Sequence, residues 1–318
     1  MSTEVVSHLL QRIDQPDLVR ILSEELTGSE LNSLLLEVFN RRLSAVTPPQ
    51  LMNLYQQNRF VKPADLPVID LKRMELDLLT FLEQHRFQPV ELSPIAPLGA
   101  CSVVAVADQK KIISALRGTE VLADATNSIA LHASDLIQTR QWEPKQPGDK
   151  LNLCAIQRHV RAQPIAGKGF TPHFKIACLV TCGPDRGSYS FERESLCHHV
   201  VAMRDLYRDH YKVDDVSFRF LCRGGYARPE DLAGCVREFI VAQHPDIRID
   251  IVESPEKTIA YYQGIQYKID IRVHGKTFEI GDGGFVDWTQ KLLQNRKERM
   301  LSTGIGFEFM YRILQGQL

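Results

Sequence analysis

Residues 278–314 read FEIGDGGFVDWTQKLLQNRKERMLSTGIGFEFMYRIL, and the interpretation of the fold depends on this stretch. It holds two pairs of glycines, Gly283 with Gly284 and Gly304 with Gly306. Between them we expect a short basic helix (QNRKERM, 294–300), and the second pair leads directly into an apolar run. Glycine is needed where the backbone takes a shape that other residues avoid, or where a ligand comes too close for a Cβ. The second interpretation predicts a nucleotide lying against bare backbone.

The chain before this stretch is rich in segments typical of β-strands, several of which follow one another without a helix. They cover 101–106, 151–163, 173–183, 216–222, 247–253, 261–275 and 276–284, with helical patterns at 125–140, 193–211 and 229–244. Several of the strands alternate polar with apolar residues. This pattern favours an α+β fold, a mainly antiparallel sheet flanked by helices, over a parallel doubly wound sheet.

The first part of the chain has a different character. Residues 1–66 show helical periodicity, ending in a segment with two prolines (RFVKPADLP, 59–67) that is typical of a linker. A long amphipathic helix is expected at 68–85. We therefore predict an N-terminal helical segment, 1–66, and a core domain, 67–318.

Composition excludes several classes of protein. The 318 residues carry a net charge of −1, with 24% charged and 44% hydrophobic residues, and no apolar run approaches the ~20 residues of a membrane span. The N-terminus does not resemble a signal peptide, so we expect a cytoplasmic protein without a membrane partner. The basic run 294–300 is expected to face solvent, which makes a nucleic-acid partner unlikely on this pattern.

The seven cysteines are odd in number and scattered, which fits reduced thiols. A metal site can be drawn from Cys178, Cys182, Cys197, His198 and His199. However, Cys178 and Cys182 lie in an apolar, strand-like run, and no CxxC pair occurs. No metal site is predicted.

A hairpin is the first candidate for chemistry. One strand carries Arg158 and Arg161, a loop rich in proline and glycine follows, and the return strand starts at His173 and Phe174. A guanidinium can grip a phosphate while an aromatic ring stacks on a base. Residues 158 and 161 have opposite parity, so they cannot face the same side of a strand. The alternative is a surface hairpin with solvated arginines.

Two further segments could line a pocket. Asp124 and Thr126 stand at a turn into a helix, where they could receive an amino group or simply cap the helix. Tyr261 and Tyr262 precede a glycine and a strand. We expect them to face opposite ways, one into a pocket and one into the core, and two core aromatics are the alternative.

Taken in chain order, these segments resemble the core of class II aminoacyl-tRNA synthetases, and within that class histidyl-tRNA synthetase. The helix at 68–85 with FQPVELSPIAP resembles motif 1, Pro94 matching its proline. VLADATNSIAL is similar to the segment that contacts the amino acid, matching at Asp124 and Thr126. The hairpin 156–180 resembles motif 2.

The same order continues to the end of the chain, so the resemblance covers about residues 68–318. AYYQG resembles the tyrosine pair of the histidine family, and GDGGFVDW its glycine-glycine-arginine-tyrosine-aspartate stretch, matching at Gly283, Gly284 and Asp287. STGIGFEFMYRIL resembles motif 3, a glycine-rich strand that enters a helix beneath ATP.

The resemblance implies a set of roles. Arg161, with Arg158 as the other register, would stabilise the reacting phosphate, and Phe174 with His173 would hold adenine. Gly304 and Gly306 would support ATP, accompanied by Mg²⁺. An amino acid would be held by Asp124, Thr126, Tyr261, Tyr262, Gly283 and Gly284. Motif 1 implies a homodimer.

Several positions depart from the family pattern. The motif 3 arginine falls on Phe309 or Tyr311, and neighbouring Arg312 could replace it only in the first register. The acidic partner of the motif 2 arginine is replaced by Gln163, or by Val160 in the other register. The chain also ends soon after motif 3, so no anticodon-binding domain is expected.

Two functions follow as hypotheses. The first is an aminoacyl-adenylate-forming ligase that activates a carboxylate, an amino acid by preference, with ATP. Its acceptor would be a carrier protein, a small amine or a tRNA acceptor stem. The second is a non-catalytic, ligand-sensing paralogue like the regulatory subunit of ATP phosphoribosyltransferase, which acts on an enzyme partner. The hairpin cations favour the first hypothesis, and the missing phosphate arginines favour the second.

Overall fold

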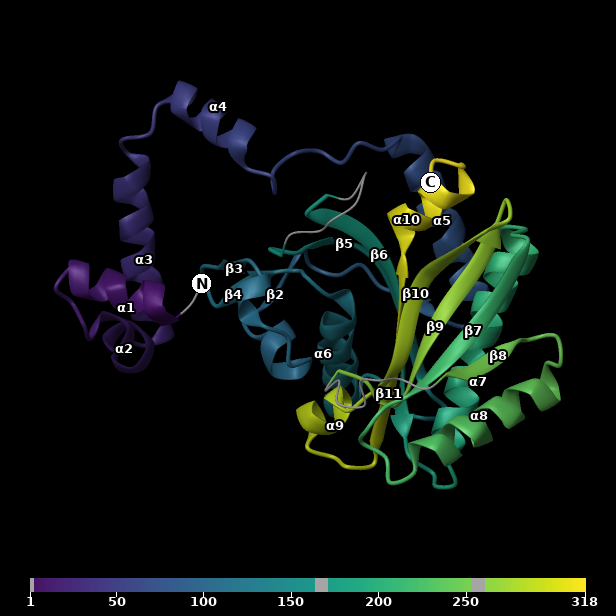
Figure 1. Ribbon diagram of the computed structural model, residues 1–318. Helices are drawn as coiled ribbons and strands as arrows, with labels where there is room; N and C mark the ends of the chain where they lie inside the picture. The colour runs from purple at the N-terminus through teal and green to yellow at the C-terminus, as the bar shows by residue number, and fades with distance from the viewer. Residues whose placement is uncertain (1–2, 164–170, 253–260) are drawn as a thin grey trace.

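The computed structural model describes residues 3–163, 171–252 and 261–318. Its centre is an eight-stranded sheet with the strand order β1-β5-β6-β11-β10-β9-β7-β8 (Figure 1). The strands are β1 (Gln88–Pro89), β5 (Leu151–Val160), β6 (His173–Pro184), β7 (Asp215–Cys222), β8 (Ile249–Val252), β9 (Gln263–Val273), β10 (Lys276–Val286) and β11 (Glu298–Gly306). Only the outer pairs β1–β5 and β7–β8 are parallel, so the predicted mainly antiparallel sheet flanked by helices is confirmed.

Helices cover the two faces of the sheet in separate layers. One face packs against α5 (Val68–Gln84), α7 (Ser190–Arg204), α8 (Pro229–Gln243) and α10 (Phe307–Leu314), together with the π-helical turn Asp205–His210. The other face packs against α6 (Ala125–Gln138), α9 (Trp288–Leu293) and the π-helical turn η2 (Ala100–Val104). A three-stranded sheet of β2 (Ile95–Pro97), β4 (Thr119–Val121) and β3 (Ser114–Ala115) lies beside α6, and a 3-10 turn covers Gln109–Lys111.

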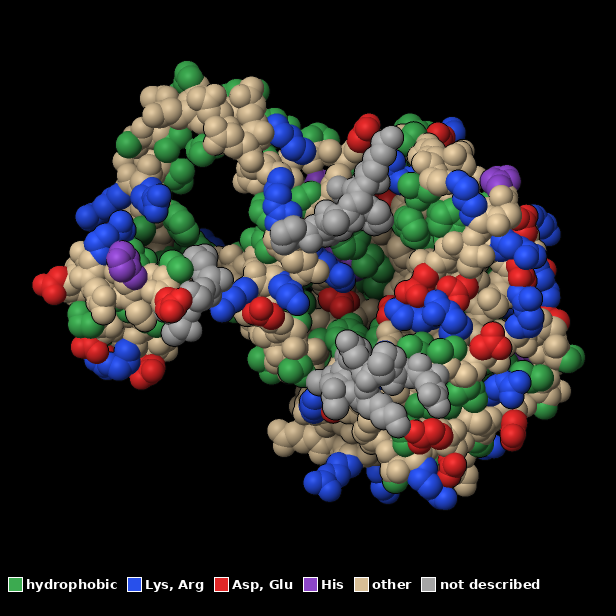
Figure 2. All heavy atoms as spheres, in the orientation of Figure 1, with side chains coloured by type: hydrophobic (Ala, Val, Ile, Leu, Met, Phe, Trp, Pro, Cys, Tyr) green, Lys and Arg blue, Asp and Glu red, His purple; other side chains and the backbone are tan. Residues whose placement is uncertain are grey.

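The two layers bury different amounts of the sheet. On the α5 side, apolar side chains such as Phe218 and Ile269 form a continuous core. On the α6 side, the smaller core stops at β6 and the ends of β10 and β11, so the central strands stay uncovered there. Figure 2 shows a hollow at this place, with acidic and basic side chains around it. Burial on one face and an open second face leave room for a ligand site.

The N-terminal helices stand apart from this sheet (Figure 1). They are α1 (Thr3–Arg12), α2 (Leu18–Arg20), the π-helical turn Ile21–Glu25, α3 (Gly28–Leu43) and α4 (Pro48–Gln57). Thr27 and Glu30 form a capping box at the start of α3, which explains why the helix begins there. None of the side chains of residues 4–57 is buried, so these helices contribute nothing to the core of the sheet.

Two local predictions are wrong. Residues 101–106, expected as a strand, instead form most of η2 and the turn after it. Residues 294–300, expected as a basic helix, form a turn and the start of β11. Gln294 ends α9 in the left-handed conformation, and the side chain of Asn295 accepts from the Lys297 amide at 3.1 Å. An asparagine that bonds its own backbone in this way competes with the helix.

Within the described part of the chain, no helix has the length and apolar character needed to cross a lipid bilayer.

Candidate functional site

A cavity of about 430 Å³ lies on the open face of the sheet, between the start of α6 and the strands β6, β11 and β10. It is lined by Asp124, Thr126, Arg161, Ile176, Cys178, Tyr261, Tyr262, Gln266, Gly281, Asp282, Ser302, Gly304 and Gly306. Seven of the thirteen were predicted as site residues, although they come from distant parts of the sequence. The cavity therefore gathers most of the predicted site in one place.

The carboxylate of Asp124 accepts three hydrogen bonds at the edge of this cavity. Its Oδ1 accepts from the backbone N–H of Thr126 at 2.9 Å and from the Thr126 hydroxyl at 2.6 Å. Its Oδ2 accepts from the Tyr261 hydroxyl at 2.8 Å. Asp124 thus caps α6, as one interpretation of the sequence had it, and also lines the cavity. The two roles are compatible, because a carboxylate has about four acceptor positions.

Both tyrosines line the cavity, so the expectation that they face opposite ways is wrong. They precede β9, where the alternation of a strand does not yet apply, and their rings meet edge to face at 4.7 Å. Burial is the main cause that raises the pKa of Tyr261 well above its usual range, and the Asp124 charge adds to it. Tyr261 therefore stays a neutral hydroxyl that donates to Asp124.

Strand register explains the floor of the cavity. Asp282 on β10 lies opposite Gly304 on β11, and Gly304 lies opposite Cys178 on β6. Residues directly opposite in neighbouring strands share a face, so these three form one row. The Asp282 carboxylate accepts from the Gln266 amide at 2.8 Å.

Arg161 and Arg158 point to opposite faces, as their parity predicts. Arg161 lines the cavity and donates through Nε to the Ala123 carbonyl at 3.2 Å. Arg158 lies on the α5 side, where it pairs with Glu308 at 2.5 Å and contacts Nδ1 of His173 at 2.9 Å. The structure places Arg158 away from the cavity, and its role as a phosphate contact stays a prediction.

Three other predicted nucleotide contacts lie outside the cavity lining. Both ring nitrogens of His173 are engaged, one with Arg158 and the other with the Lys62 carbonyl at 2.5 Å. Arg312 donates to the Asp65 carbonyl at 3.1 Å, so it does not replace the motif 3 arginine. Phe174 stands beside the site on the correct face, with the Arg161 guanidinium 5.4 Å from its ring centre. His173 and Arg312 lie away from the cavity, and the roles of all three residues as ligand contacts stay predictions.

The glycines divide into two kinds. A Cβ on Gly304 would meet only Cγ2 of Ile176 at 3.7 Å, so its backbone is open toward the cavity. A Cβ on Gly283 would lie 2.5 Å from the Ser302 carbonyl oxygen, and one on Gly284 would lie 2.6 Å from the Tyr262 ring. Neither Gly283 nor Gly284 lines the cavity. The structure needs these two glycines for close packing, and their assignment as amino-acid contacts stays a prediction.

A buried histidine holds the start of α6, which lines the cavity. His159, fully buried, accepts through Nε2 from the Ala125 amide at 2.9 Å and so fixes the start of α6. Burial lowers the pKa of His159 to about 4, against the opposing charge of Asp124. The neutral ring keeps its proton on Nδ1, because Nε2 is the acceptor.

The residues present fit a nucleotide better than a resident metal. The bare backbone at Gly304 and the guanidinium of Arg161 suit a flat base and a phosphate. In the described ranges, no group of three or more His, Cys, Asp and Glu side chains could hold a metal ion. His199, one of the residues considered for zinc, bonds Thr181 at 2.8 Å and Thr303 at 2.7 Å. Mg²⁺ would therefore come with phosphate oxygens, as is usual for this ion.

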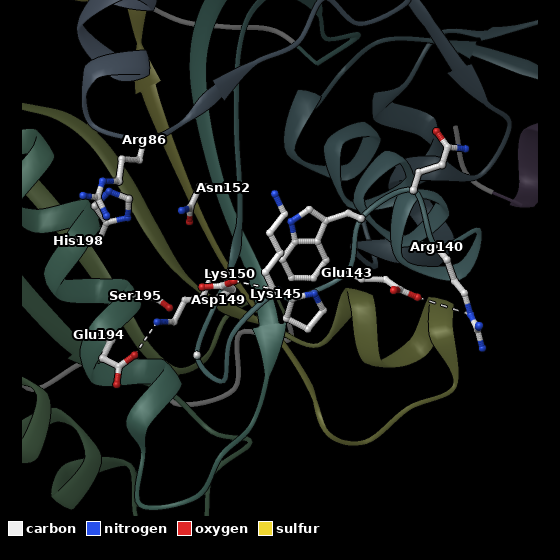
Figure 3. Close-up of a pocket in the computed structure, with 14 residues that line it drawn as sticks. Arg86, Arg140, Glu143, Lys145, Asp149, Lys150, Asn152, Glu194, Ser195 and His198 are labelled. Atoms are coloured by element: carbon white, nitrogen blue, oxygen red, sulfur yellow. Dashed lines mark hydrogen bonds and ion pairs between the residues drawn. The ribbon is translucent and has the colours of Figure 1, made fainter.

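A second cavity, of about 1040 Å³, lies between the segment after α6 and the helix α7 (Figure 3). It is larger, but none of the predicted site residues lines it. Lys150 reaches Glu194 at 2.6 Å, and Arg140 lies 3.7 Å from Glu143. The Asp149 carboxylate accepts from the backbone amides of Lys145 and Gln146.

Several lining residues were not predicted from the sequence, chiefly Gln266, Asp282 and Ser302. Polar residues in a strand usually indicate a solvent-facing side, so these three residues did not indicate a ligand site. The usable signal was the spacing: Asp282 has the same parity as Gly284, and Ser302 the same parity as Gly304. The loop 164–170 of the predicted hairpin lies outside the described residues.

No family model matches the sequence, and no curated protein matches it. Solved structures do match in three dimensions. Apo histidyl-tRNA synthetase from S. aureus aligns with a TM-score of 0.60 and 13% identity, over 82% of this chain and 70% of that chain. An ATP phosphoribosyltransferase regulatory subunit/histidyl-tRNA synthetase from Bacillus halodurans C aligns with a TM-score of 0.57 and 14% identity, over 80% and 82%.

The fold is class II synthetase-like. A putative threonyl-tRNA synthetase from Aeropyrum pernix also aligns, with a TM-score of 0.57 and 13% identity, over 76% of this chain and 59% of that chain. The predicted resemblance in fold is thereby confirmed. Within this fold, β5 and β6 form an antiparallel hairpin where the sequence resembled motif 2, and β11 leads into α10 where it resembled motif 3. At this level of identity the likeness concerns the fold alone.

Proposed function

We propose that the protein binds an amino acid in the 430 Å³ cavity and activates its carboxylate with ATP, as an acyl-adenylate. One observation carries the proposal: Asp124, held by Thr126 and Tyr261, faces the same cavity as Arg161 and the bare backbone of Gly304. An anion for an ammonium group, a cation for a phosphate and a flat surface for a base thus converge.

The acidic end of the cavity suits an ammonium group. Thr126 and Tyr261 use three of the acceptor positions of Asp124, and one position with the Thr126 hydroxyl oxygen is left for a ligand N–H. Charge-assisted hydrogen bonds of this kind are about twice as strong as neutral ones. The neutral Tyr261 fixes the carboxylate without competing for the ammonium charge.

ATP, when bound, supplies an α-phosphorus that the ligand carboxylate attacks, with pyrophosphate as the leaving group. Arg161 can hold a non-bridging oxygen of that phosphate, because its guanidinium lies on the cavity side while Nε is anchored to Ala123. A pre-oriented cation that meets developing charge is worth several kcal/mol in a water-poor site. Gly304 lets a flat group approach the backbone of β11.

A second function is favoured by one specific observation. Arg158 and Arg312, the other predicted phosphate cations, are held by Glu308 and by the Asp65 carbonyl, away from the cavity. A cavity with Arg161 as its lining arginine suits amino-acid sensing without catalysis. In that case the protein would act as a regulatory subunit for an enzyme partner.

Pyrophosphate exchange across the twenty amino acids, paired with calorimetric titration of each, separates the two functions. The proposal expects ATP-dependent exchange with at least one amino acid. Binding of an amino acid without exchange, and without any effect of ATP on the melting temperature, would support the sensor instead. If neither amino acids nor ATP bind, both functions are refuted.

We further propose that the activated amino acid passes to a carrier protein, a small amine or a tRNA acceptor stem. We also propose that the protein is a homodimer. The dimer rests on α5, whose side chains of Val68, Ile69 and Leu76 are 67%, 65% and 68% exposed. An apolar stripe of this kind on a helix is typical of an interface. Sedimentation velocity with a charged variant such as Leu76→Glu tests it: wild type should sediment as a dimer and the variant as a monomer.

A further inference from the structure

The 430 Å³ cavity continues into a second, smaller chamber of about 180 Å³. Asp124, Arg161 and Tyr261 line both spaces and so stand at the junction between them. The chamber lies between η2, the first turn of α6 and the segment that follows β5. No residue of the chamber beyond these three was predicted as part of the site.

An asparagine in this chamber makes no hydrogen bond of ordinary geometry with its side chain. Asn127 is 1% exposed and lines the chamber three residues after Asp124. Neither its Oδ1 nor its Nδ2 reaches a partner at ordinary hydrogen-bond geometry within the described structure, and the side chain lies beside the Cys101 thiol, which is a weak donor and acceptor. Buried polar groups are almost always hydrogen-bonded, and an unmade bond is costly, so such a group in a cavity needs an explanation. A bound ligand would supply it.

The surroundings of Asn127 indicate a neutral ligand group. Ala105, Ala107 and Ile112 form apolar walls beside Asn127, and the chamber is also lined by Gln163 and by Lys111, which is exposed. Burial is the main cause that raises the pKa of Cys101 to about 12, so this neighbour is an uncharged thiol. An asparagine side chain presents one donor and one acceptor side by side. The complementary group is another carboxamide, which offers an acceptor and a donor in the same plane.

We propose that the chamber receives the side chain of the bound amino acid, and that this side chain ends in a carboxamide. The inference rests on the proposed function, because it places the ligand ammonium on Asp124 at the junction. From there the carboxylate points toward Arg161 and the larger space, and the side chain enters the chamber. The chamber equals roughly six liquid-water volumes, which is enough for the side chain of asparagine or glutamine.

Calorimetric titration tests the chemical class with asparagine and glutamine against aspartate, glutamate, leucine and histidine. We expect asparagine or glutamine to bind at least tenfold more tightly than its acid counterpart and than leucine. Tighter binding of an acidic, apolar or aromatic amino acid would overturn the inference.

The variant Asn127→Ala separates a ligand role from a structural one. It removes a polar group that makes no hydrogen bond of ordinary geometry, so the melting temperature of the ligand-free variant should stay the same or rise. Binding of the carboxamide amino acid should fall at least tenfold. Ser128→Ala is the matched control, since Ser128 is the next residue of α6, its buried hydroxyl also lacks a partner, and it does not line the chamber.

The outcomes distinguish this inference from the proposed function. A lower melting temperature for Asn127→Ala with unchanged ligand affinity assigns Asn127 to the fold and overturns the inference, while pyrophosphate exchange would continue. Binding of asparagine or glutamine without any exchange supports the chamber and refutes the activation chemistry.

Discussion

The cavities of about 1040 Å³ and 430 Å³ differ in what their charged groups do. In the larger one (Figure 3), Lys150 binds Glu194, Arg140 approaches Glu143, and Asp149 accepts from the backbone of its own loop. In the smaller one, Asp124 and Arg161 are positioned by neighbours but keep capacity for further bonds. The larger cavity is a hollow between ion pairs, and the smaller one keeps charged groups with free bonding capacity, as the proposed ligand site requires.

The difference indicates that the position of a cavity in the fold is a better guide to a ligand site than its volume. The smaller cavity rests on the buried sheet and on α6, whose start is fixed by His159 and Asp124. Rigid elements with fixed side chains hold a ligand more accurately than loops do. The following experiments compare the two regions, beginning with the largest expected effect.

Arg161→Ala should reduce pyrophosphate exchange by about 10²–10³-fold, because it removes the cation that meets the developing phosphate charge. The matched control is Arg140→Ala in the larger cavity, which should retain exchange within about twofold. The rate of exchange at saturating ATP is the measurement. An equal loss in both variants would contradict the assignment of the site.

Gly283→Ala should lower the free energy of unfolding by about 3 kcal/mol, since the new Cβ would press on the Ser302 carbonyl and the Tyr267 ring. Gly148→Ala in the larger cavity should cost less, about 1–2 kcal/mol. Its φ of +106° strains a residue with a Cβ, but the new Cβ meets only the far end of the Arg186 side chain, which can shift. Urea denaturation measures both, and similar values would show that β10 and β11 are not held together as tightly as described.

The free energy of unfolding should decrease as the pH is lowered, because of His159. Its folded-state pKa of about 4 lies below the ordinary value of 6.5, so the unfolded chain binds more protons in that window. His159 thus contributes about 3 kcal/mol to the free energy of unfolding. This contribution is fully present above pH 6.5 and is lost as the pH falls toward 4. Burial lowers the pKa of His198 and His199 as well, which adds to the slope in the same direction.

The control for this prediction is His159→Gln, whose amide oxygen can still accept from Ala125. Subtracting the pH dependence of the variant isolates the share of His159, because His198 and His199 remain. Chemical denaturation at pH 4.5 and 7 gives the slope of the free energy of unfolding against pH, once for wild type and once for the variant. Identical slopes in wild type and variant would show that His159 is not buried as a neutral ring.

Lys150→Ala should change the free energy of unfolding by less than about 1 kcal/mol and leave exchange unaffected. Its partner Glu194 is 39% exposed and also binds Arg186, so the pair is screened and replaceable. Denaturation and exchange assays check both statements. A loss of exchange here would move the functional site toward the larger cavity.

Sequence alone predicts the sheet well because its strands adjoin in the chain and alternate in polarity. It also predicts that Arg158 and Arg161 face opposite sides, but not which of them faces the ligand. That choice depends on where α5 and α6 pack, which is a tertiary property. Asp124 could be predicted as a site residue because the turn into α6, which it caps, is also the place where it lines the cavity.

The failures have physical causes as well. Residues 101–106 are apolar and β-branched, yet they fold as a π-helical turn because Glu120 accepts from the backbone amides of Gly99 and Cys101. Arg312 is close to the motif 3 position in sequence but lies on the outer side of α10. Asp282 and Gln266 escaped notice because their mutual hydrogen bond is apparent only once β9 and β10 are paired.

A crystal structure after soaking with ATP, Mg²⁺ and the preferred amino acid tests the central claim most directly. The account predicts electron density in the 430 Å³ cavity, with the ligand amino group on Asp124, a phosphate on Arg161 and a base against Gly304. Density in the cavity of Figure 3 instead, or a ligand that touches neither Asp124 nor Arg161, would contradict it.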